Sequence, residues 1–488
     1  MNPLLGLGSL RRLPVESRPL VRPGTVPAGI VHIGLGAFHR AHQALYTEEA
    51  LAAAGGDWGI VGVAPRSTAV VAALEAQDLL YSVSEVSAEG TRARVVGAFA
   101  GARAASADPD SVVALLADPA IRVVTLCMTE KAYRLDPATG RLLDDPALDA
   151  DLRGDRPPTT VPGLLFRGLV ARSRTDAGPI AIVSCDNFSA NGRRTGGMLE
   201  AAYARAGHDD SWLRANVRCP GTMVDRIVPA STDASRAAAA ALLGVRDEVA
   251  VYGEPYRQWV IEDDFPAGRP AWETAGAVLT DDAGPWERLK LRSLNGVHSA
   301  MAYLGALAGC ETIADAYRMA GLADAMRRFV AEDVAPSFTP PDGVSVVEYG
   351  ESALERFANP AIVHRTTQVA MDGSQKLPQR VLETIRDRRA AGGVPRYGAL
   401  VVAAWMRYAR GVADDGRSLT LDDPLADRIR AAVADAPASP EGLADALFGL
   451  TAVFPADLAA DETVRGLVVE WLTELDKHGV ESTLAGVR

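Results

Sequence analysis

The sequence predicts an α/β fold in its first part and a mostly α-helical fold in its second part. In the first part, short β-branched runs alternate with helical stretches, a pattern typical of a parallel sheet with helices on both faces. A glycine-containing turn directly follows the first of these runs. From Trp286 onward the sequence changes to Ala- and Leu-rich helical periodicity, so we predict domains at 1–285 and 286–488.

The elements expected in the first domain follow the chain in order. Residues 1–28 are rich in Arg and Pro, and we expect them to form a loosely ordered lead-in. β-Branched composition predicts strands at 28–33, 60–63, 91–96, 121–126 and 179–184. Helical periodicity predicts helices from the glycine turn to Leu51 and at 111–117 and 163–174.

The second domain is expected to consist of helices joined by short loops. The periodic stretches lie at 289–309, 322–333, 380–391, 399–412, 423–434, 441–450 and 462–477. Two of these helices have clear start signals, because Asp423 and Ser439 each precede a proline. An N-cap side chain followed by proline in the first turn is a favoured way to begin a helix.

Composition excludes several classes of protein. The chain has 488 residues, 48% of them hydrophobic, and a net charge of −12, which argues against a nucleic-acid or anionic-membrane surface. Its cysteines, Cys127, Cys185, Cys219 and Cys310, are far apart, which favours a reducing compartment and no structural zinc. The N-terminus lacks the order of a signal peptide, and no apolar run approaches a membrane span. We therefore expect a soluble cytoplasmic protein.

The turn Gly34-Leu-Gly36-Ala-Phe38, placed between a strand and a helix, is a candidate dinucleotide-binding turn. Glycines there allow the backbone to approach a pyrophosphate at a helix N-terminus. A plain tight turn is the alternative, because His39 stands where the third glycine of the pattern belongs. The acidic residue that selects a ribose is also missing after the second strand, where Arg66 occurs. Arg66 could meet a 2′-phosphate or be solvated, which leaves NAD and NADP open.

The stretch from Lys290 to His298 is the strongest candidate for chemistry. At 100° per residue, Lys290, Asn295, His298 and the preceding Glu287 share an arc of about 140° on a helix. A base, an amide and an imidazole on one face suit alcohol or carbonyl chemistry. The lysine could accept a hydroxyl proton if burial lowers its pKa. Gly296 leaves room for a group to approach the backbone. The alternative is the solvated face of a surface helix.

Two further polar segments are candidates for ligand contacts. Asn187 follows a predicted strand and so emerges at the carboxyl edge of the sheet, where ligands bind in open α/β folds; a simple turn or cap is the alternative. The segment at 364–380 carries Arg365, Lys376 and Arg380, which suit an anionic or polyhydroxylated ligand. A surface turn is the alternative for this segment.

Taken together, these stretches resemble one family, the mannitol dehydrogenases, which are polyol-specific long-chain dehydrogenases. The family comprises mannitol 2-dehydrogenase, fructuronate reductase (D-mannonate oxidoreductase) and their relatives. The segments that carry the resemblance occur in the family's order, at 34–43, 184–187, 223–227, 254–263, 290–298 and 372–376. The lysine–asparagine–histidine pattern at 290–298 is the most specific of them.

The resemblance implies a Rossmann-like N-terminal domain and an active site in the cleft between the two domains. It also implies hydride transfer to a nicotinamide, with NAD as the expected cofactor, NADP left open, and no metal. Residue by residue, Lys290 matches the family's general base, and Asn187 and Asn295 match its oxyanion-holding amides. His298 matches the imidazole that positions the substrate.

Two more residues match the family, and one segment bears on the substrate. Glu287 matches a carboxylate proposed to gate proton exit, and Asp225 a polar residue near the substrate. The segment at 364–380 is nearer the fructuronate reductase version, because some mannitol dehydrogenases have arginine where this chain has Gln368. Arg365 and Lys376 could hold a hexuronate carboxylate, or equally the far hydroxyls of mannitol.

The expected activity is the interconversion of D-mannonate and D-fructuronate. The alternatives are D-mannitol and D-fructose, or another polyol such as D-arabinitol. Two other classes stay open: a nucleotide-binding regulatory protein without catalysis, and a dehydrogenase of a phosphorylated sugar alcohol. The expected partner is a small sugar acid or polyol, and the resemblance favours a monomer.

Overall fold

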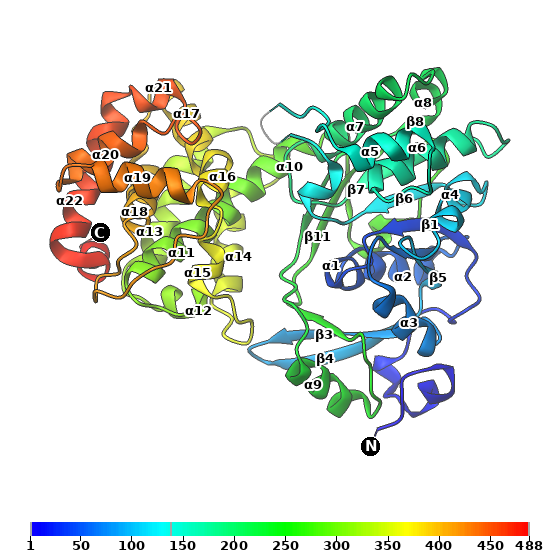
Figure 1. The fold of residues 1–488 in the computed structure, drawn as a ribbon. Helices are drawn as coiled ribbons and strands as arrows, with labels where there is room; N and C mark the ends of the chain where they lie inside the picture. Colours follow the sequence, from blue (N-terminus) through cyan, green and yellow to red (C-terminus); the bar gives the residue numbers. More distant parts are fainter. Residues whose placement is uncertain (1, 137–138, 487–488) are drawn as a thin grey trace. The chain divides into compact units, whose positions relative to one another are not determined.

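The chain folds into two compact units, Met1–Gly284 and Pro285–Arg488 (Figure 1). The structure is a computed structural model that describes residues 2–136 and 139–486. The first unit is α/β and the second is helical. The predicted fold class is confirmed, and the structural boundary at 284 lies next to the predicted one at 285.

A six-stranded parallel sheet is the centre of the first unit. Its strands, in spatial order, are β5 (Phe99–Ala104), β2 (Gly59–Ala64), β1 (Ala28–Ile33), β6 (Val123–Leu126), β7 (Ile180–Ser184) and β8 (Val217–Arg218). The chain builds outward from β1 in one direction and then returns to β6 on its other side. Strand order therefore reverses between β1 and β6, and ligands of open α/β sheets bind at the carboxyl ends beside such a reversal.

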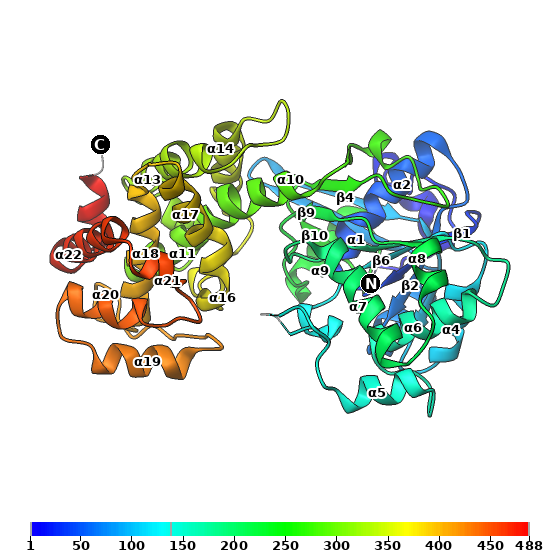
Figure 2. The ribbon, with the colours of Figure 1, turned by 90° about the horizontal axis from the view of Figure 1, so that it is seen from above.

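Helices cover both faces of this sheet because alternate residues of each strand point to opposite sides. Ile30 packs in one apolar cluster, while its neighbour Val31 packs in the other. The first cluster includes α2 (Gln43–Ala54) and α3 (Thr68–Ala76). The second includes α4 (Pro109–Ala117), α5 (Pro146–Arg153), α6 (Val161–Arg172), α7 (Asn191–Arg205) and α8 (Ser211–Asn216). Figure 2 shows α2 on one side of the sheet and α4, α6 and α7 on the other.

Two three-stranded sheets complete the first unit. One contains β3 (Tyr81–Ser87), β4 (Gly90–Val96) and β10 (Val251–Gly253), and the other β9 (Thr222–Asp225), β11 (Gln258–Glu262) and β12 (Val278–Thr280). The segment at 91–96 was expected in the parallel sheet, and this assignment is wrong. It lies in β4, which pairs antiparallel with β3, and β5 takes the place in the main sheet. β-Branched composition identifies a strand but not its partner.

The N-terminal segment is folded against the first unit, and the expected loose lead-in is wrong for its described residues. Two 3₁₀ helices occur here, η1 (Leu7–Arg12) and η2 (Val15–Ser17). Leu5 and Leu13 are buried in one apolar cluster with Val245. The Leu5 amide donates to the Arg246 carbonyl at 2.8 Å. Helix α9 (Asp233–Leu243) leads into that contact.

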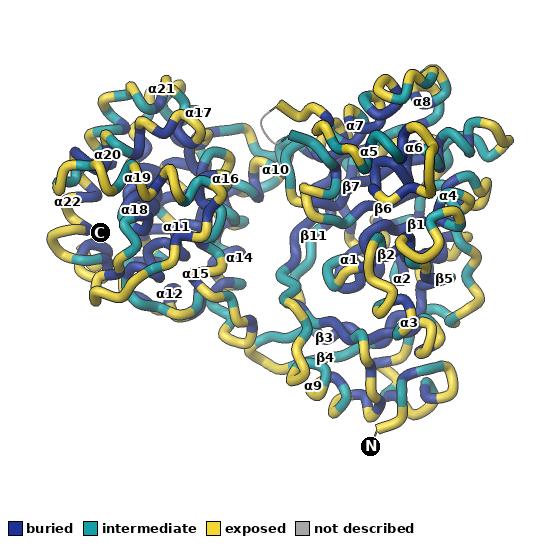
Figure 3. The backbone as a smooth tube through the Cα atoms, in the orientation of Figure 1, coloured by how far each residue is buried: buried dark blue, intermediate teal, exposed yellow. Residues whose placement is uncertain are grey.

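Two buried helices, α11 (Gly296–Leu307) and α18 (Arg396–Ala409), pack together in the second unit (Figure 3). The other helices are α10 (Gly284–Leu289), α12 (Ile313–Tyr317), α13 (Leu322–Arg328), α14 (Val346–Phe357), α15 (Thr366–Val369), α16 (Gly373–Leu377), α17 (Glu383–Ala390), α19 (Ala426–Asp435), α20 (Pro440–Phe448), α21 (Ala456–Ala459) and α22 (Glu462–Ala485). Ser439 caps α20 as predicted. Asp423 is not the N-cap of α19, because the helix begins later, at Ala426; its carboxylate accepts from the Leu425 amide and from Ser374.

Three stretches of the second unit are π-helical: η5 (Lys290–Asn295), η6 (Phe329–Val334) and η8 (Pro378–Leu382). Each continues directly into or out of an α-helix, and η5 packs against both η6 and η8. π-Helical turns are rare in proteins, and those that do occur are often found at functional sites. All of η5 and most of η6 and η8 fall in stretches that were expected to be α-helical, since apolar periodicity over a few residues cannot reveal one extra residue per turn.

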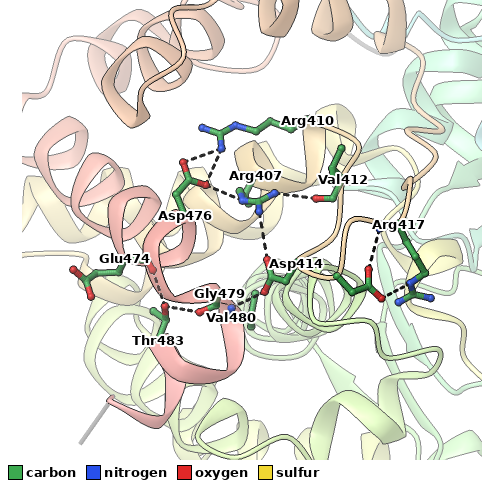
Figure 4. A network of polar contacts seen from close by, with 11 residues as sticks. Arg407, Arg410, Val412, Asp414, Arg417, Glu474, Asp476, Gly479, Val480 and Thr483 are labelled. Carbon is green, nitrogen blue, oxygen red and sulfur yellow. Dashed lines mark hydrogen bonds and ion pairs between the residues drawn. The ribbon is translucent and has the colours of Figure 1, made fainter.

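A polar network holds a kink in the last helix (Figure 4). Gly479, inside α22, has φ 71°, a left-handed conformation that glycine adopts readily. The carboxylate of Asp414 accepts a 2.7 Å hydrogen bond from the Val480 amide just after the kink. Asp476, just before it, pairs with Arg410 at 2.7 Å. These contacts tie both sides of the kink to the segment after α18.

Candidate active site

The Lys290 segment places its polar side chains differently from the predicted α-helix. In a π-helix the backbone hydrogen bonds run from residue i to i+5, so residues five apart lie one turn apart. Lys290 and Asn295 have that spacing within η5. His298 follows Asn295 by three residues in α11, which again places neighbours on one face. The side chains of Lys290, Asn295 and His298 therefore span a narrower part of the helix surface than the predicted arc of about 140°.

Lys290 is inside the protein, with 5% of its surface exposed, while Asn295 is half-buried. The predicted alternative, a solvated surface face, is thus wrong for the lysine. Glu287, one turn earlier on α10, is half-buried. Burial of a lysine beside an amide in an unusual helical turn is an arrangement suited to a general base.

Gly296 lies where the three π-helical segments meet. A Cβ at this position would lie 2.9 Å from the Arg380 carbonyl oxygen and 3.3 Å from the Phe329 ring. We expected Gly296 to leave room for a group to approach the backbone, and groups do approach it, but they belong to the protein rather than to a ligand. The backbone of η8 and the ring from η6 occupy that space, so this glycine serves packing between helices.

His298 is held in a cationic environment. Its ring stacks on Phe357, with centroids 4.5 Å apart and planes at 12°, and His364 lies 5.4 Å away. Burial lowers the pKa of His298 well below its usual value, and the nearby charges act in the same direction. Those groups are His364, Arg380, Lys376 and Arg356. The imidazole is therefore neutral at physiological pH, with one donor and one acceptor nitrogen.

The Nε2 atom of His298 is buried and has no hydrogen-bond partner among the residues that the structure describes. Buried polar atoms almost always have a partner. A substrate hydroxyl or carbonyl would satisfy it. This observation fits the predicted role of His298 in holding a substrate.

The three cations of the 364–380 segment differ in their surroundings. Arg380 donates to the Ser299 hydroxyl at 3.0 Å, and burial lowers its pKa to about 10. Lys376 is half-buried, and burial, followed by the charge of Arg380, lowers its pKa to about 8. Arg365 is exposed. Lys376 and Arg380 are therefore the better candidates for a ligand anion. Arg356, from α14, also acts on His298, and the sequence analysis missed it.

The glycine turn of the first unit lies at the predicted place, after the central strand β1. Gly34 has φ 110°, and a Cβ there would overlap the Cys127 carbonyl oxygen, so only glycine fits. Gly36 precedes α1 (Ala37–Ala41), and among the described residues beyond its chain neighbours a Cβ there would meet only the Gly34 carbonyl oxygen, at 3.7 Å. His32 supports the turn, because its ring nitrogens bond the Gly34 carbonyl at 2.9 Å and the Thr125 hydroxyl at 2.8 Å.

The missing third glycine is replaced by a buried ring. His39 stacks on His32 with ring centroids 3.2 Å apart. Phe38 is half-buried and stacks on His42 at 5.0 Å. Arg66 is exposed beyond the end of β2, and its carbonyl accepts from Ser106. The open space over Gly36 and the reversal of strand order beside it fit a dinucleotide pyrophosphate.

Asn187 lies just beyond β7 and is exposed, while Asp225, at the end of β9, is buried. Asp186 directly precedes Asn187, and the sequence predicted for it no more than a place in the polar segment after the strand or in a turn. Asp186 is 7% exposed and accepts from the Tyr133 hydroxyl and the Met128 amide, each at 2.6 Å. Burial raises the pKa of Asp186 to about 7. The feature of the sequence that could have identified Asp186 as a site residue is its position just after a central strand.

Neither a metal-binding cluster nor a membrane-spanning helix occurs among the described residues. No group of three or more His, Cys, Asp and Glu side chains there is arranged to hold a metal ion. Within the same residues, no helix has the length and apolar character that crossing a membrane requires.

Comparison with known proteins identifies relatives over nearly the whole chain. The mannitol dehydrogenase Rossmann domain model matches residues 28–274, and the mannitol dehydrogenase C-terminal domain model matches residues 282–475. The D-mannonate oxidoreductase of Escherichia coli (strain K12) is 40% identical over 486 residues, which are 97% of this chain and 98% of that protein. The mannitol 2-dehydrogenase of Cereibacter sphaeroides is 37% identical over 481 residues, covering 96% and 98%.

Two solved structures are also similar to this chain over nearly its whole length. The ternary complex of Pseudomonas fluorescens mannitol 2-dehydrogenase with NAD and D-mannitol is 33% identical in sequence. It superposes with a TM-score of 0.85 and covers 99% of both chains. A substrate-free D-sorbitol dehydrogenase is 29% identical and has a TM-score of 0.89.

Proposed function

The chain belongs to the mannitol dehydrogenase family, and from this premise we propose that it is an NAD-dependent oxidoreductase for D-mannonate and D-fructuronate. It is an oxidoreductase that acts on the CH–OH group of a polyol or sugar acid. The finer choice of a sugar acid is our proposal. The full-length similarity to a D-mannonate oxidoreductase supports it.

The cationic surroundings of His298 carry the preference for an acid. Lys376 and Arg380 both act on this neutral imidazole. Bringing several cations together in a partly buried place costs free energy unless an anion balances them. A substrate carboxylate would provide that balance, whereas the hydroxyls of mannitol would not. Asp372 and Asp423 offset part of the charge at Lys376.

The first unit would hold the cofactor. We propose that Gly34, Gly36 and the backbone near Phe38 contact the pyrophosphate, because the turn is open over Gly36. Arg66, exposed beyond β2, would contact the adenosine ribose or a 2′-phosphate. A bound nicotinamide supplies the hydride acceptor at its C4 atom. The preference for NAD over NADP rests on the similarity to the NAD complex.

The proposed mechanism needs no metal. Lys290, in its neutral form, takes the proton from the secondary hydroxyl at C5 of mannonate as the hydride leaves. The amides of Asn187 and Asn295 donate hydrogen bonds to the oxygen as negative charge develops on it. His298 holds a neighbouring substrate oxygen, which gives its buried Nε2 a partner. In the reduction direction Lys290 returns the proton.

Two further residues have proposed roles. Glu287 precedes Lys290 by one helical turn and would pass the proton between the lysine and water. Asp225, buried at the end of β9, would accept a hydrogen bond from a substrate hydroxyl.

The monomeric state and the cytoplasmic location stay predictions. Light scattering tests the first of them.

The first experiment compares D-fructuronate and D-fructose as substrates, with NADH and then NADPH, by following reduced-cofactor absorbance. We expect the higher kcat/KM with fructuronate and NADH. A higher value with fructose would make the chain a mannitol 2-dehydrogenase. Activity with neither ketose, or only with another polyol such as D-arabinitol, would refute the substrate proposal and leave the family unchanged.

The variant Lys376→Met tests the carboxylate contact directly. Loss of a charged hydrogen bond should lower kcat/KM for fructuronate by about tenfold to hundredfold. Fructose, which lacks the carboxylate, should be affected much less. The control is Lys477→Met, a lysine exposed on α22, which should change neither value. Equal losses with both substrates would show that Lys376 contacts hydroxyls.

A further inference from the structure

The loop that carries Asn187 is anchored by side chains on both sides of it. It runs from the end of β7 to the start of α7. Asn187 is exposed on this loop, whereas Asp186 and Asn191 are buried, with 7% and 2% of their surfaces exposed.

Asp186 fixes the start of the loop. Its Oδ2 atom accepts from the Tyr133 hydroxyl, and its Oδ1 atom from the Met128 amide. The Tyr133 hydroxyl also lies 2.7 Å from the Ser184 hydroxyl. The ring of Tyr133 packs edge-on against Phe188, with centroids 4.9 Å apart. The residues on both sides of Asn187 are thus joined to the segment that follows β6.

Asn191 fixes the end of the loop and joins it to another strand. Its Nδ2 atom donates to the Asp186 carbonyl at 3.1 Å and to the Thr222 carbonyl at 2.9 Å. Its Oδ1 atom accepts from the Thr222 amide at 2.9 Å. Both functions of the amide are therefore used. Thr222 begins β9, the strand that ends at Asp225, and its hydroxyl donates to the Ser184 carbonyl at 2.6 Å.

Close packing makes the connection stiff. A Cβ at Gly192, the next residue of α7, would lie 2.5 Å from both the Cys219 carbonyl oxygen and the Gly221 amide nitrogen. The start of α7 therefore touches the backbone just before β9. The Asn187 loop and the strand that carries Asp225 cannot shift independently without breaking these contacts.

We propose that Asn191 is a positioning residue, which sets the Asn187 amide in register with Asp225 through its hydrogen bonds to Asp186 and Thr222. This inference rests on the proposed role of Asn187 in holding the substrate oxygen. An amide is needed at 191 because two of its neighbours are carbonyl acceptors and one is an N–H donor. A carboxylate in its place faces both carbonyls without donors.

The test measures kcat, KM and the Kd of NADH for Asn187→Ala, Asn191→Asp and the double variant. Small displacements of a group that acts on the transition state cost up to about a hundredfold in rate. We expect Asn191→Asp to lower kcat by about tenfold or more, with the Kd of NADH unchanged. In the Asn187→Ala background the same change should have no further effect on kcat, because the group being positioned is gone.

Controls separate positioning from folding. Asn216→Asp removes another amide bond to a backbone carbonyl, that to Trp212, and should leave kcat unchanged. If Asn191→Asp does not fold, Thr222→Val removes the hydroxyl that accepts from the Asn191 amide at 3.2 Å and donates to the Ser184 carbonyl, and Thr222→Ser restores it. We expect a lower kcat for the valine variant and recovery for the serine variant, measured well below each variant's Tm.

The outcomes distinguish the two proposals. An unchanged kcat for Asn187→Ala would refute the proposed role of Asn187, and the positioning role with it. A lowered kcat for Asn187→Ala, combined with an unchanged kcat for Asn191→Asp, would overturn only the positioning role. If the losses of kcat in Asn187→Ala and Asn191→Asp add fully in the double variant, the positioning role is also overturned. A loss of Tm with normal kcat for Thr222→Val would also overturn it.

Discussion

Replacing Gly296 by alanine tests whether the junction of the three π-helical segments controls the active site. Gly296 has φ −62° and ψ −50°, so alanine fits the backbone without strain. The added methyl would lie 2.9 Å from the Arg380 carbonyl oxygen and 3.3 Å from the Phe329 ring. The first neighbour is backbone and cannot rotate away. The substitution therefore pushes η8 and η5 apart.

Two opposing terms determine the change in stability. Alanine in a helix is more stable than glycine by about 1 kcal/mol. Forcing an extra methyl into a packed interior costs about 1–3 kcal/mol. The net effect on the free energy of unfolding lies between about 0 and 2 kcal/mol of destabilisation. The effect on activity is larger, because Arg380 also contacts Ser299 beside the proposed site. A shift near 1 Å costs up to about a hundredfold in kcat/KM.

The matched control is Gly466→Ala in α22. Gly466 is inside a helix and exposed, and a Cβ there meets nothing within 4 Å. The Gly466→Ala variant gains the same helix propensity without a steric overlap, so its free energy of unfolding should rise by about 1 kcal/mol. Urea denaturation of both variants isolates the packing cost as the difference between them, which should be about 1–3 kcal/mol. Equal stabilisation of both, with full activity of Gly296→Ala, would refute the reasoning.

Three further predictions concern other parts of the chain. Lys290→Ala should lower kcat by about 10² to 10⁴ while keeping the Kd of NADH, measured by fluorescence titration. Burial raises the pKa of Glu48 from 4.5 to about 7, so the folded state holds this proton more tightly than the unfolded state. Its contribution to stability falls as pH rises through that range, by up to about 3 kcal/mol, and Glu48→Gln should lose this pH dependence in urea denaturation. Asp414→Ala should lower stability by about 1–3 kcal/mol, by the same assay, since the Val480 amide loses its partner at the kink.

Each of these has a result that contradicts it. Unchanged turnover of Lys290→Ala would remove the assignment of the base. The same loss of stability between pH 5 and pH 8 in Glu48→Gln and the unaltered protein would show that other groups cause it. An Asp414→Ala protein as stable as the unaltered one would show that the kink does not depend on that carboxylate.

Much of the fold was predictable because its signals are local. The alternation of strands and helices, the glycine turn after β1 and the change of texture near residue 285 are all visible in short windows of sequence. Polar residues just after a strand were correctly expected at the carboxyl edge of the sheet, as Asn187 shows. The mistakes concern pairing and register, as with β4, because a strand's own residues do not name its neighbour.

The sequence by itself determined the family, the order of the elements and the residue types available for chemistry. Only the tertiary structure decided how they combine. Lys290 and Asn295 lie one turn apart because η5 is π-helical, and η5 packs against η6 and η8, which are distant in sequence. Arg365 and Arg380 are both cations of one segment, yet Arg365 is exposed whereas Arg380 is half-buried and donates to Ser299. Local sequence sets propensity, whereas burial and charge environment depend on contacts between segments that are far apart in the chain.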